Sequence, residues 1–196
     1  YSRYGNVEQM AVAVAEGVRE ANSEPILAFI GDSITPPEVI ARDERWQATH
    51  DRLSASYPRA DSEGLAVADA AAFGAPARFG IMAAQMKNYF DTLGGVWMAG
   101  SCHDKPAGCF TSTSTLHGGQ EVGNYTMWPA LAHLGFIIVG VCYATTELLT
   151  TTTGGGPYGP GHVAGGASDI PVDETEKAVC RALGERLGRL ADAYRQ

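Results

Sequence analysis

The sequence predicts an α/β fold built on a doubly wound, five-stranded parallel sheet, and three observations support this prediction. Amphipathic helical segments alternate along the chain with short apolar runs, the pattern of a parallel sheet with helices on both faces. Most of these apolar runs lead into turns rich in Gly, Ser, Thr or Pro. The chain has 196 residues, so we expect residues 1–196 to form a single domain.

The chain begins on a polar turn that leads directly into a helix. Residues 1–7 are mostly small or polar, and apolar residues then recur at helical spacing from Val7 to about residue 21. Such a turn offers backbone N–H groups at the positive end of the helix dipole, which predicts an anion site, although an ordinary capped helix start would look alike. Because this kind of turn normally follows a buried strand, we expect an apolar strand of about five to seven residues ahead of residue 1.

The remaining elements follow from apolar runs and helical faces along the chain. We expect further strands at residues 25–30, 70–73, 107–111 and 136–141. We expect further helices at about residues 81–93, 122–134 and 173–194. Gly94 and Gly95 should close the helix before them in a left-handed cap, which leaves Trp97 on a loop, and Gly135 should end the next helix. Residues 34–64 form an irregular excursion on one face of the sheet.

Composition and charge argue against several classes of partner. The net charge of −8 disfavours nucleic acid and anionic membrane surfaces, since both bind basic protein surfaces. No apolar run approaches the roughly 18 residues of a membrane span, so we expect no integral membrane contact. The four cysteines lack zinc-like spacing and nothing demands an oxidising compartment, so we expect no metal site and a cytoplasmic protein.

Three loops follow predicted strands and should meet beyond the carboxyl ends of the sheet, where such folds bind ligands. They are residues 2–7, 76–80 and 112–120. The first offers hydroxyl and backbone donors to a phosphate, although it has neither the Walker ending nor the GxGxxG pattern. The second contributes Arg78 and Phe79 as a cation and an aromatic face, and the third contributes hydroxyls and glycine backbone. This combination suits a mononucleotide with a planar heterocycle.

Five motifs along the chain resemble those of the WrbA family, the flavodoxin-like NAD(P)H:quinone oxidoreductases that carry FMN. The motifs are Pro76-Ala77-Arg78-Phe79-Gly80, Leu93-Gly94-Gly95-Val96-Trp97, Gly118-Gly119-Gln120-Glu121, Leu131-Ala132-His133 and Gly156-Pro157-Tyr158-Gly159. The resemblance extends from Ser2 to about Gly166 and is weakest between residues 33 and 64. It implies a flavodoxin-like fold, a homotetramer, FMN as cofactor, and two-electron reduction of a small-molecule quinone with NADH or NADPH as donor. We hypothesise a ping-pong cycle in which nicotinamide and quinone use the same flavin face in turn.

The resemblance also implies which residues form the site. The FMN phosphate would be surrounded by Ser2, Arg3, Tyr4, Gly5, Asn6 and Val7. The flavin ring would be flanked by Pro76, Ala77, Arg78 and Phe79. The polar edge of the ring and the ribityl chain would be held by Ser112, Thr113, Ser114, Thr115, Gly118 and Gly119. His133 would approach the flavin from a neighbouring subunit and is the one candidate for a catalytic side chain, because the chemistry itself belongs to FMN. Tyr4 and Trp97 would line the side used by nicotinamide and quinone.

Two departures from the family pattern bear on the cofactor. Ala77 stands where the family commonly has threonine, and Ser114 replaces a frequent glycine, which could weaken FMN binding. Two other classes of function therefore stay open. One is an electron-transfer flavodoxin without a nicotinamide site of its own, and the other is a non-catalytic family member that has lost FMN.

Overall fold

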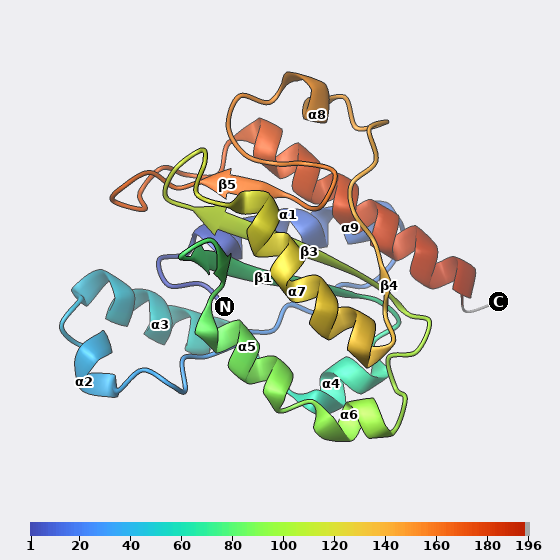
Figure 1. Cartoon of the computed structure of the whole chain (residues 1–196), viewed down its shortest axis with the longest axis horizontal. Helices are drawn as coiled ribbons and strands as arrows, with labels where there is room; N and C mark the ends of the chain where they lie inside the picture. Colours follow the sequence, from blue (N-terminus) through green and yellow to red (C-terminus); the bar gives the residue numbers. More distant parts are fainter. Residues whose placement is uncertain (195–196) are drawn as a thin grey trace.

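The computed structural model in Figure 1 describes residues 1–194. In that range the helices are α1 (Asn6–Glu20), α2 (Pro37–Ile40), α3 (Glu44–Ser56), α4 (Ser62–Val67), α5 (Ala84–Asp91), α6 (Gly94–Met98), α7 (Gln120–Leu134), α8 (Glu147–Thr150) and α9 (Glu174–Tyr194). The strands are β1 (Ala71–Arg78), β2 (Ile81–Met82), β3 (Pro106–Thr113), β4 (Ile137–Ile138) and β5 (Gly161–Val163).

The strands form one sheet in the order β2-β1-β3-β4, with β5 also paired to β3. Strands β1, β4 and β5 run parallel to β3, whereas β2 is antiparallel to β1. Strand β1 pairs along most of one edge of β3. On the other edge of β3, β4 pairs with its start and β5 pairs with its end. The predicted α/β class is confirmed, but one of the five strands is antiparallel, contrary to the all-parallel sheet expected.

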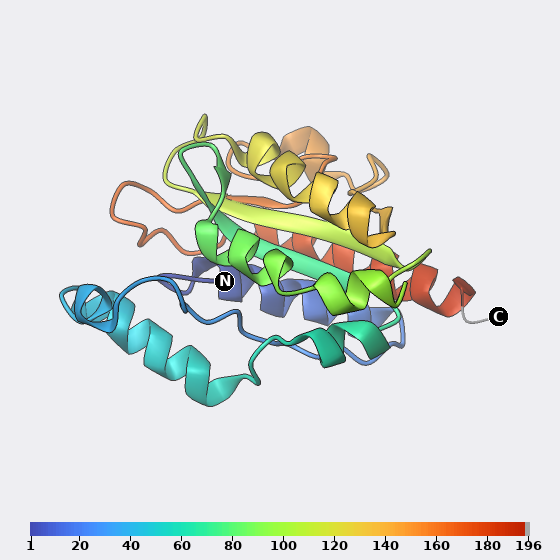
Figure 2. The same ribbon diagram turned by 60° about the horizontal axis from the view of Figure 1, so that its bottom comes forward.

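Helices cover both faces of this sheet (Figure 2). Helices α1 and α9 pack together on one face, and α5 and α7 lie on the other. The crossing of α1 and α9 is very close, because a Cβ at Gly17 would lie 1.9 Å from the carbonyl oxygen of Arg181, and one at Gly184 would lie 1.9 Å from that of Val14. Glycine is required at both positions. The core beneath α5 and α7 includes Phe73, Met86, Phe90, Met127 and Leu131.

The prediction of a buried strand at residues 25–30 is wrong. Of these six residues, Phe29 alone forms a bridge, with Arg59, and Ile26 is 84% exposed. The backbone of Phe29 bonds to Pro58 and Ala60, at 2.8 and 3.0 Å, so this run pairs with a short segment rather than with a strand. An apolar run becomes a strand only where a neighbouring strand can take its backbone hydrogen bonds.

Other element boundaries differ from the predictions for similar reasons of pairing. The strand expected at residues 70–73 continues to Arg78 as β1, because its last residues pair with β2. The helix expected from residue 81 begins at Ala84, since β2 takes residues before it. The strand expected at residues 136–141 is only two residues long as β4, and the sheet resumes at β5, which was not predicted.

The prediction that Gly94 and Gly95 close a helix is also wrong. They begin α6, and the N–H of Trp97 donates to the carbonyl oxygen of Leu93 (3.0 Å), so helical bonding continues across the glycines. Trp97 therefore lies on a helix and not on a loop. The left-handed end predicted at Gly135 is confirmed, with a φ of 90° after α7.

Three further features concern residues 1–194. Among the helices of residues 1–194, none combines the length and apolar composition that crossing a bilayer requires. In the same range, no three or more His, Cys, Asp or Glu side chains gather in a way that could hold a metal ion. All four cysteines are free thiols, and burial raises the pKa of Cys109 and of Cys180, which act as core side chains.

Candidate functional site

A pocket opens where β1 and β3 end, and four segments of the chain meet there. Its lining residues are Ser2, Arg3, Tyr4, Asn6, Val7, Pro76, Ala77, Arg78, Ser112, Thr113, Ser114, Ala164 and Ser168. We call it the first pocket. Three of its four segments are the loops predicted from the sequence, and the fourth follows β5.

The first loop turns into α1 through Gly5, which has a left-handed φ of 92°. The N–H of Gly5 donates to the Oγ of buried Ser2 (3.1 Å). Within the described chain no side chain caps the start of α1. The positive end of this 15-residue helix therefore stays available to an anion bound in the pocket.

Arg3 adds a guanidinium to the same end of the first pocket. Its Nη2 lies 3.4 Å from Asp43 Oδ2, and its Cζ lies 3.8 Å from the ring centroid of Trp46. Its Nε is buried and has no hydrogen-bond partner among residues 1–194. Because a buried donor normally has an acceptor, this atom is a donor that a ligand of the pocket can satisfy.

The ends of β1 and β3 form the facing wall. Pro76 and Ser112 are register partners, so the two strands deliver their last residues side by side. Thr113 Oγ1 donates to the carbonyl oxygen of Thr115 (2.8 Å), which curls the third loop back toward the strand. The wall thus carries hydroxyls on one strand and the guanidinium of Arg78 on the other.

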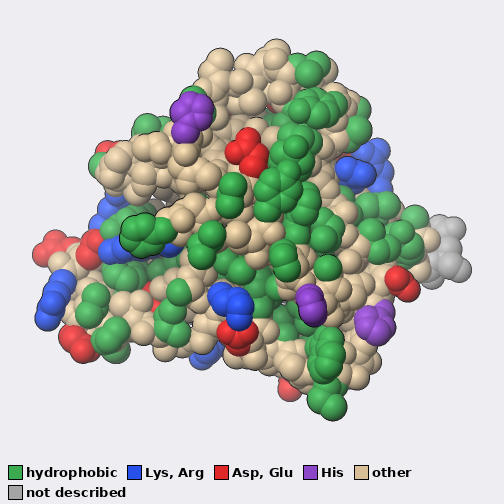
Figure 3. All heavy atoms as spheres, in the orientation of Figure 1, with side chains coloured by type: hydrophobic (Ala, Val, Ile, Leu, Met, Phe, Trp, Pro, Cys, Tyr) green, Lys and Arg blue, Asp and Glu red, His purple; other side chains and the backbone are tan. Residues whose placement is uncertain are grey.

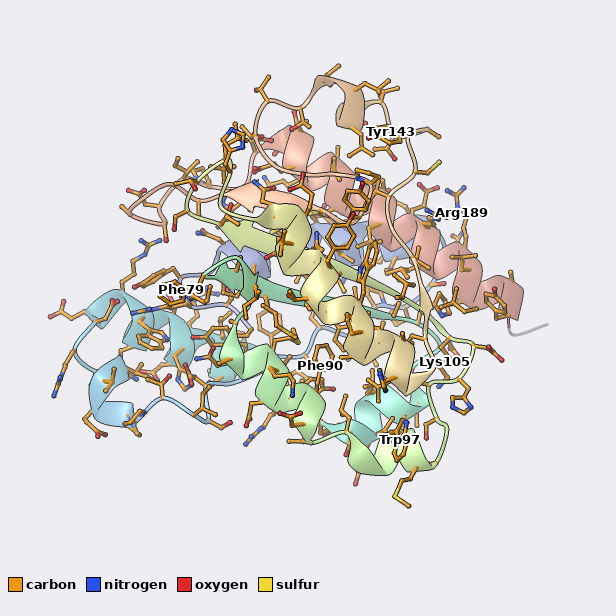
Figure 4. All side chains as sticks on the ribbon, in the orientation of Figure 1. Phe79, Phe90, Trp97, Lys105, Tyr143 and Arg189 are labelled. Atoms are coloured by element: carbon orange, nitrogen blue, oxygen red, sulfur yellow. The ribbon has the colours of Figure 1, made fainter. Side chains whose placement is uncertain are left out.

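Five more of the predicted cofactor residues belong to these loops but do not line the first pocket. These residues are Gly5, Phe79, Thr115, Gly118 and Gly119. Phe79 has a left-handed φ of 51° and stands fully exposed on the loop after β1 (Figure 4). A Cβ on Gly119 would lie 3.1 Å from the Cα of Gly80, so glycine allows the second and third loops to touch.

The fourth wall contains Ala164 and Ser168, which the sequence did not predict as site residues. The carbonyl oxygen of Ser168 accepts from Asn6 Nδ2 (3.1 Å) and also from the guanidinium of Arg45. Arg45 Nη1 donates as well to the carbonyl oxygen of Ala167 (2.8 Å). The run of small residues after β5 was the available signal, but it could not be used because β5 itself was not predicted.

A buried pair, His162 and Glu176, holds the chain on both sides of this wall, at Val163 and at Ile170. His162 Nδ1 lies 2.7 Å from Glu176 Oε2, and His162 Nε2 lies 3.0 Å from the carbonyl oxygen of Ile170. Glu176 also accepts from the N–H groups of Val163 (3.1 Å) and Asp173 (3.0 Å). One carboxylate therefore joins β5, just before the fourth wall, to the start of α9.

A second hollow lies between α5, α6 and α7 and contains two further predicted site residues. Trp97 and His133 line it together with apolar groups that include Phe90, Leu93 and Pro129. Figure 4 shows Trp97 on α6, on a different side of the molecule from Phe79. Within one chain, Tyr4 and Trp97 therefore belong to different hollows.

Solved structures with the same architecture identify the class of fold. A crystal structure of a WrbA-like flavodoxin from Agrobacterium tumefaciens aligns with a TM-score of 0.61 at 22% identity, covering 98% of this chain and 93% of that one. A flavodoxin from the domain Archaea also has a TM-score of 0.61, at 14% identity, covering 98% and 94%. The chain thus has a flavodoxin-like fold, as predicted.

Sequence relatives define the family. Residues 2–148 match the family described as NADPH-dependent FMN reductase. Proteins named NAD(P)H dehydrogenase (quinone) from Rhodopseudomonas palustris and Caulobacter vibrioides are 39% and 40% identical, over 97% of this chain and 94% of theirs. A protein of that name from Geobacter sulfurreducens is 39% identical over the same shares. This chain belongs to the NADPH-dependent FMN reductase family, and the resemblance found in the loop motifs is confirmed.

Proposed function

We propose that this chain is an FMN-dependent NAD(P)H:quinone oxidoreductase that reduces quinones to hydroquinones by two-electron transfer. The observation that carries the proposal is the first pocket, where an uncapped helix N-terminus, a buried arginine donor and two strand ends converge. The names of relatives that are 39% and 40% identical over nearly the whole chain support the same reaction class.

In this proposal, each wall of the first pocket holds one part of FMN. The phosphate would be held by Ser2, Arg3, Tyr4, Gly5, Asn6 and Val7. The flavin ring would be held by Pro76, Ala77, Arg78 and Phe79. The ribityl chain and the polar ring edge would be held by Ser112, Thr113, Ser114, Thr115, Gly118 and Gly119. Bound FMN would supply the redox chemistry, taking electrons from NADH or NADPH and passing them to a quinone.

The chain's own groups would supply binding, orientation and charge. The positive end of α1 and the guanidinium of Arg3 favour a phosphate. Arg78 places a second positive charge in the wall, which favours negative charge on whatever the pocket binds. The phenol of Tyr4 donates to Asp43 Oδ2 (2.6 Å), which fixes the orientation of the ring in the pocket wall.

We also propose a homotetramer, in which His133 and Trp97 of one copy complete the substrate side of a neighbour's pocket. Support comes from the outer face of α7, where Val122 is 48% exposed and hydrophobic side chains form a band (Figure 3). The ring of Tyr125 in this band lies 4.7 Å from those of both Trp128 and Tyr158. A helix that is apolar on its outer face as well as its inner face is normally covered by another surface.

The same proposal treats residues 1–196 as one domain working in the cytoplasm. The packing of the first helix against the last, both on one sheet, supports a single folding unit. The need for NADH or NADPH supports a compartment that contains reduced nicotinamides.

The proposal is tested by a flavin titration followed by turnover. Protein mixed with FMN and freed of excess should keep the visible flavin absorption, lose it with NADH or NADPH, and regain it with benzoquinone. Rates measured with both substrates varied should give the parallel double-reciprocal lines of a ping-pong cycle. Protein that keeps FMN but oxidises NADH only with a partner reductase would indicate an electron-transfer flavodoxin. Protein that binds no FMN would overturn the proposal.

A further inference from the structure

The first turn of α3 contacts the first loop, although it belongs to an excursion for which the sequence predicted no role. Trp46 is only 6% exposed, and the guanidinium carbon of Arg3 stacks over its ring, 3.8 Å from the ring centroid. The same guanidinium lies 5.0 Å from the ring centroid of Tyr4, and that of Arg45 lies 4.7 Å from it. Two arginines and two aromatic rings thus form one continuous cluster that joins α3 to the first loop.

One carboxylate holds this cluster together. Asp43 caps α3, since its Oδ1 accepts from the N–H of Trp46 (3.0 Å). Its Oδ2 accepts from the phenol of Tyr4 (2.6 Å) and lies 3.4 Å from Arg3 Nη2. The hydrogen bonds from Tyr4 and from the N–H of Trp46, in that order, hold the pKa of Asp43 below its ordinary value. Two side chains of the first loop, Arg3 and Tyr4, are therefore held from the start of α3.

The same turn of α3 also reaches the fourth wall of the first pocket. Arg45 donates to the carbonyl oxygens of Ala167 and Ser168, and Asn6 of α1 donates to Ser168 as well. Both walls at this end of the pocket are consequently held by the first turn of α3, from Asp43 to Trp46. The arrangement leaves the buried Nε of Arg3 as a donor without an acceptor among the described residues.

We propose that Asp43, Arg45 and Trp46 are positioning residues for the phosphate end of the cofactor site and act through Arg3, Tyr4 and Ser168. The inference rests on the proposed FMN function. In this inference, the start of α3 makes the pocket selective for a flavin that carries a phosphate. Loss of these residues should weaken the binding of FMN, while riboflavin, which has the same ring without a phosphate, should be affected little.

The experiment measures dissociation constants of FMN and of riboflavin for the apoprotein by quenching of flavin fluorescence. The variants are Trp46→Leu, Trp46→Phe and Asp43→Asn. Trp46→Phe keeps an aromatic face for Arg3 and should retain most of the affinity. Asparagine at position 43 still caps a helix, so Asp43→Asn removes the charge without removing the cap. Trp46→Leu and Asp43→Asn should each lose about tenfold in FMN affinity relative to riboflavin.

The matched control is Leu53→Ala. Leu53 lies on the same helix, seven residues after Trp46, and is 1% exposed, so its truncation weakens the packing of α3. This variant should melt at a lower temperature and keep the wild-type ratio of FMN to riboflavin affinity. If Trp46→Leu does not fold, Asp43→Asn provides the same test.

The outcomes separate this inference from the proposed function. If wild-type protein binds FMN and both test variants keep its FMN-to-riboflavin ratio, the positioning role is wrong and the enzyme proposal stands. If Leu53→Ala changes the ratio as much as Trp46→Leu does, the effect is only structural and the inference is also wrong. If wild-type protein binds neither flavin, the proposed function fails and the inference fails with it.

Discussion

Two walls of the first pocket, the first loop and the fourth wall, are held in place in different ways. The backbone of the first loop is fixed locally, by the left-handed Gly5 and the hydroxyl of Ser2, although its side chains Arg3 and Tyr4 contact Asp43 at the start of α3. The fourth wall, residues 164–168, depends on side chains from distant segments. Glu176 accepts from the N–H of Val163 just before it, and Arg45 donates to the carbonyl oxygens of Ala167 and Ser168 within it. The contrast predicts that the first loop is most sensitive to substitutions that change its backbone conformation. The fourth wall should be most sensitive to the loss of contacts with distant side chains.

The largest effect is expected from Glu176→Ala. The change leaves His162 Nδ1 and the N–H groups of Val163 and Asp173 without their acceptor in a buried site. Removing one partner of such a pair should lower the free energy of unfolding by about 3–5 kcal/mol, measured by urea titration of the apoprotein. At a temperature where the variant is folded, the free energy of FMN binding should change less than the free energy of unfolding does.

Two variants control this prediction. Glu176→Gln keeps the volume and one acceptor, so it should be less damaging than the alanine variant. Glu174→Ala removes an exposed carboxylate from the same helix and should leave stability essentially unchanged. A stability equal to wild type in Glu176→Ala would show that the buried pair does not hold the fourth wall.

The next largest effect is expected from Gly5→Ala, which tests the first wall. A Cβ at this position meets nothing closer than Arg52 Nη2 at 3.6 Å, so the penalty is conformational and not steric. An alanine held at a φ of 92° should lower the free energy of unfolding by about 1–2 kcal/mol. In contrast to Glu176→Ala, this variant should lose FMN affinity out of proportion to its loss of stability.

Gly155→Ala is the matched control for that substitution. Gly155 has a similar φ of 108°, its added Cβ would meet nothing closer than Val179 Cγ1 at 3.4 Å, and it lies outside the predicted site loops and the lining of the first pocket. It should show a comparable loss of stability in urea with FMN affinity near wild type. Equal losses of FMN affinity in the two variants would show that the backbone conformation of the first loop has no special role in FMN binding.

A smaller effect is expected from Arg45→Gln, which releases the fourth wall from α3. The lost hydrogen bonds to backbone carbonyl groups are exposed to solvent, so unfolding should become easier by only about 1 kcal/mol. The FMN affinity should fall more than in Arg42→Gln, which removes an exposed arginine three residues earlier. Calorimetry of FMN binding to both variants measures the difference.

The smallest effect concerns pH and the contacts that α3 makes with the first loop. The pKa of Asp43 is lowered in the folded protein, so its contribution to stability is present above about pH 4 and is lost as pH falls through the folded value. Burial, followed by the hydrogen bond to Asp43, raises the pKa of Tyr4, whose contribution is lost only as pH rises above about 10. Between these limits, neither group should change the melting temperature with pH. Below about pH 4 the melting temperature should fall, and Asp43→Asn should remove part of that fall. An unchanged slope would contradict the assignment.

Much of the site could be predicted because the signals were local. The turn before α1, the strand-to-loop transitions after β1 and β3, and the loop motifs all lie within short stretches of sequence, and residues from each line one pocket. The strand predicted at residues 25–30 failed because apolar character does not reveal whether a neighbouring strand is available to pair. The fourth wall was missed for the same reason, since β5 exists only through its pairing with the end of β3.

By itself, the sequence determined the alternation of helices and strands, the flavodoxin-like class, the family, and three of the four segments around the pocket. These properties depend on periodicity and turn chemistry, which neighbouring residues decide. Tertiary structure alone decided that one strand is antiparallel, that Trp97 and His133 lie in a separate hollow, and that Asp43 and Trp46 hold the first loop. Each of these depends on contacts between residues far apart in the chain, and only the folded arrangement of backbone partners specifies them.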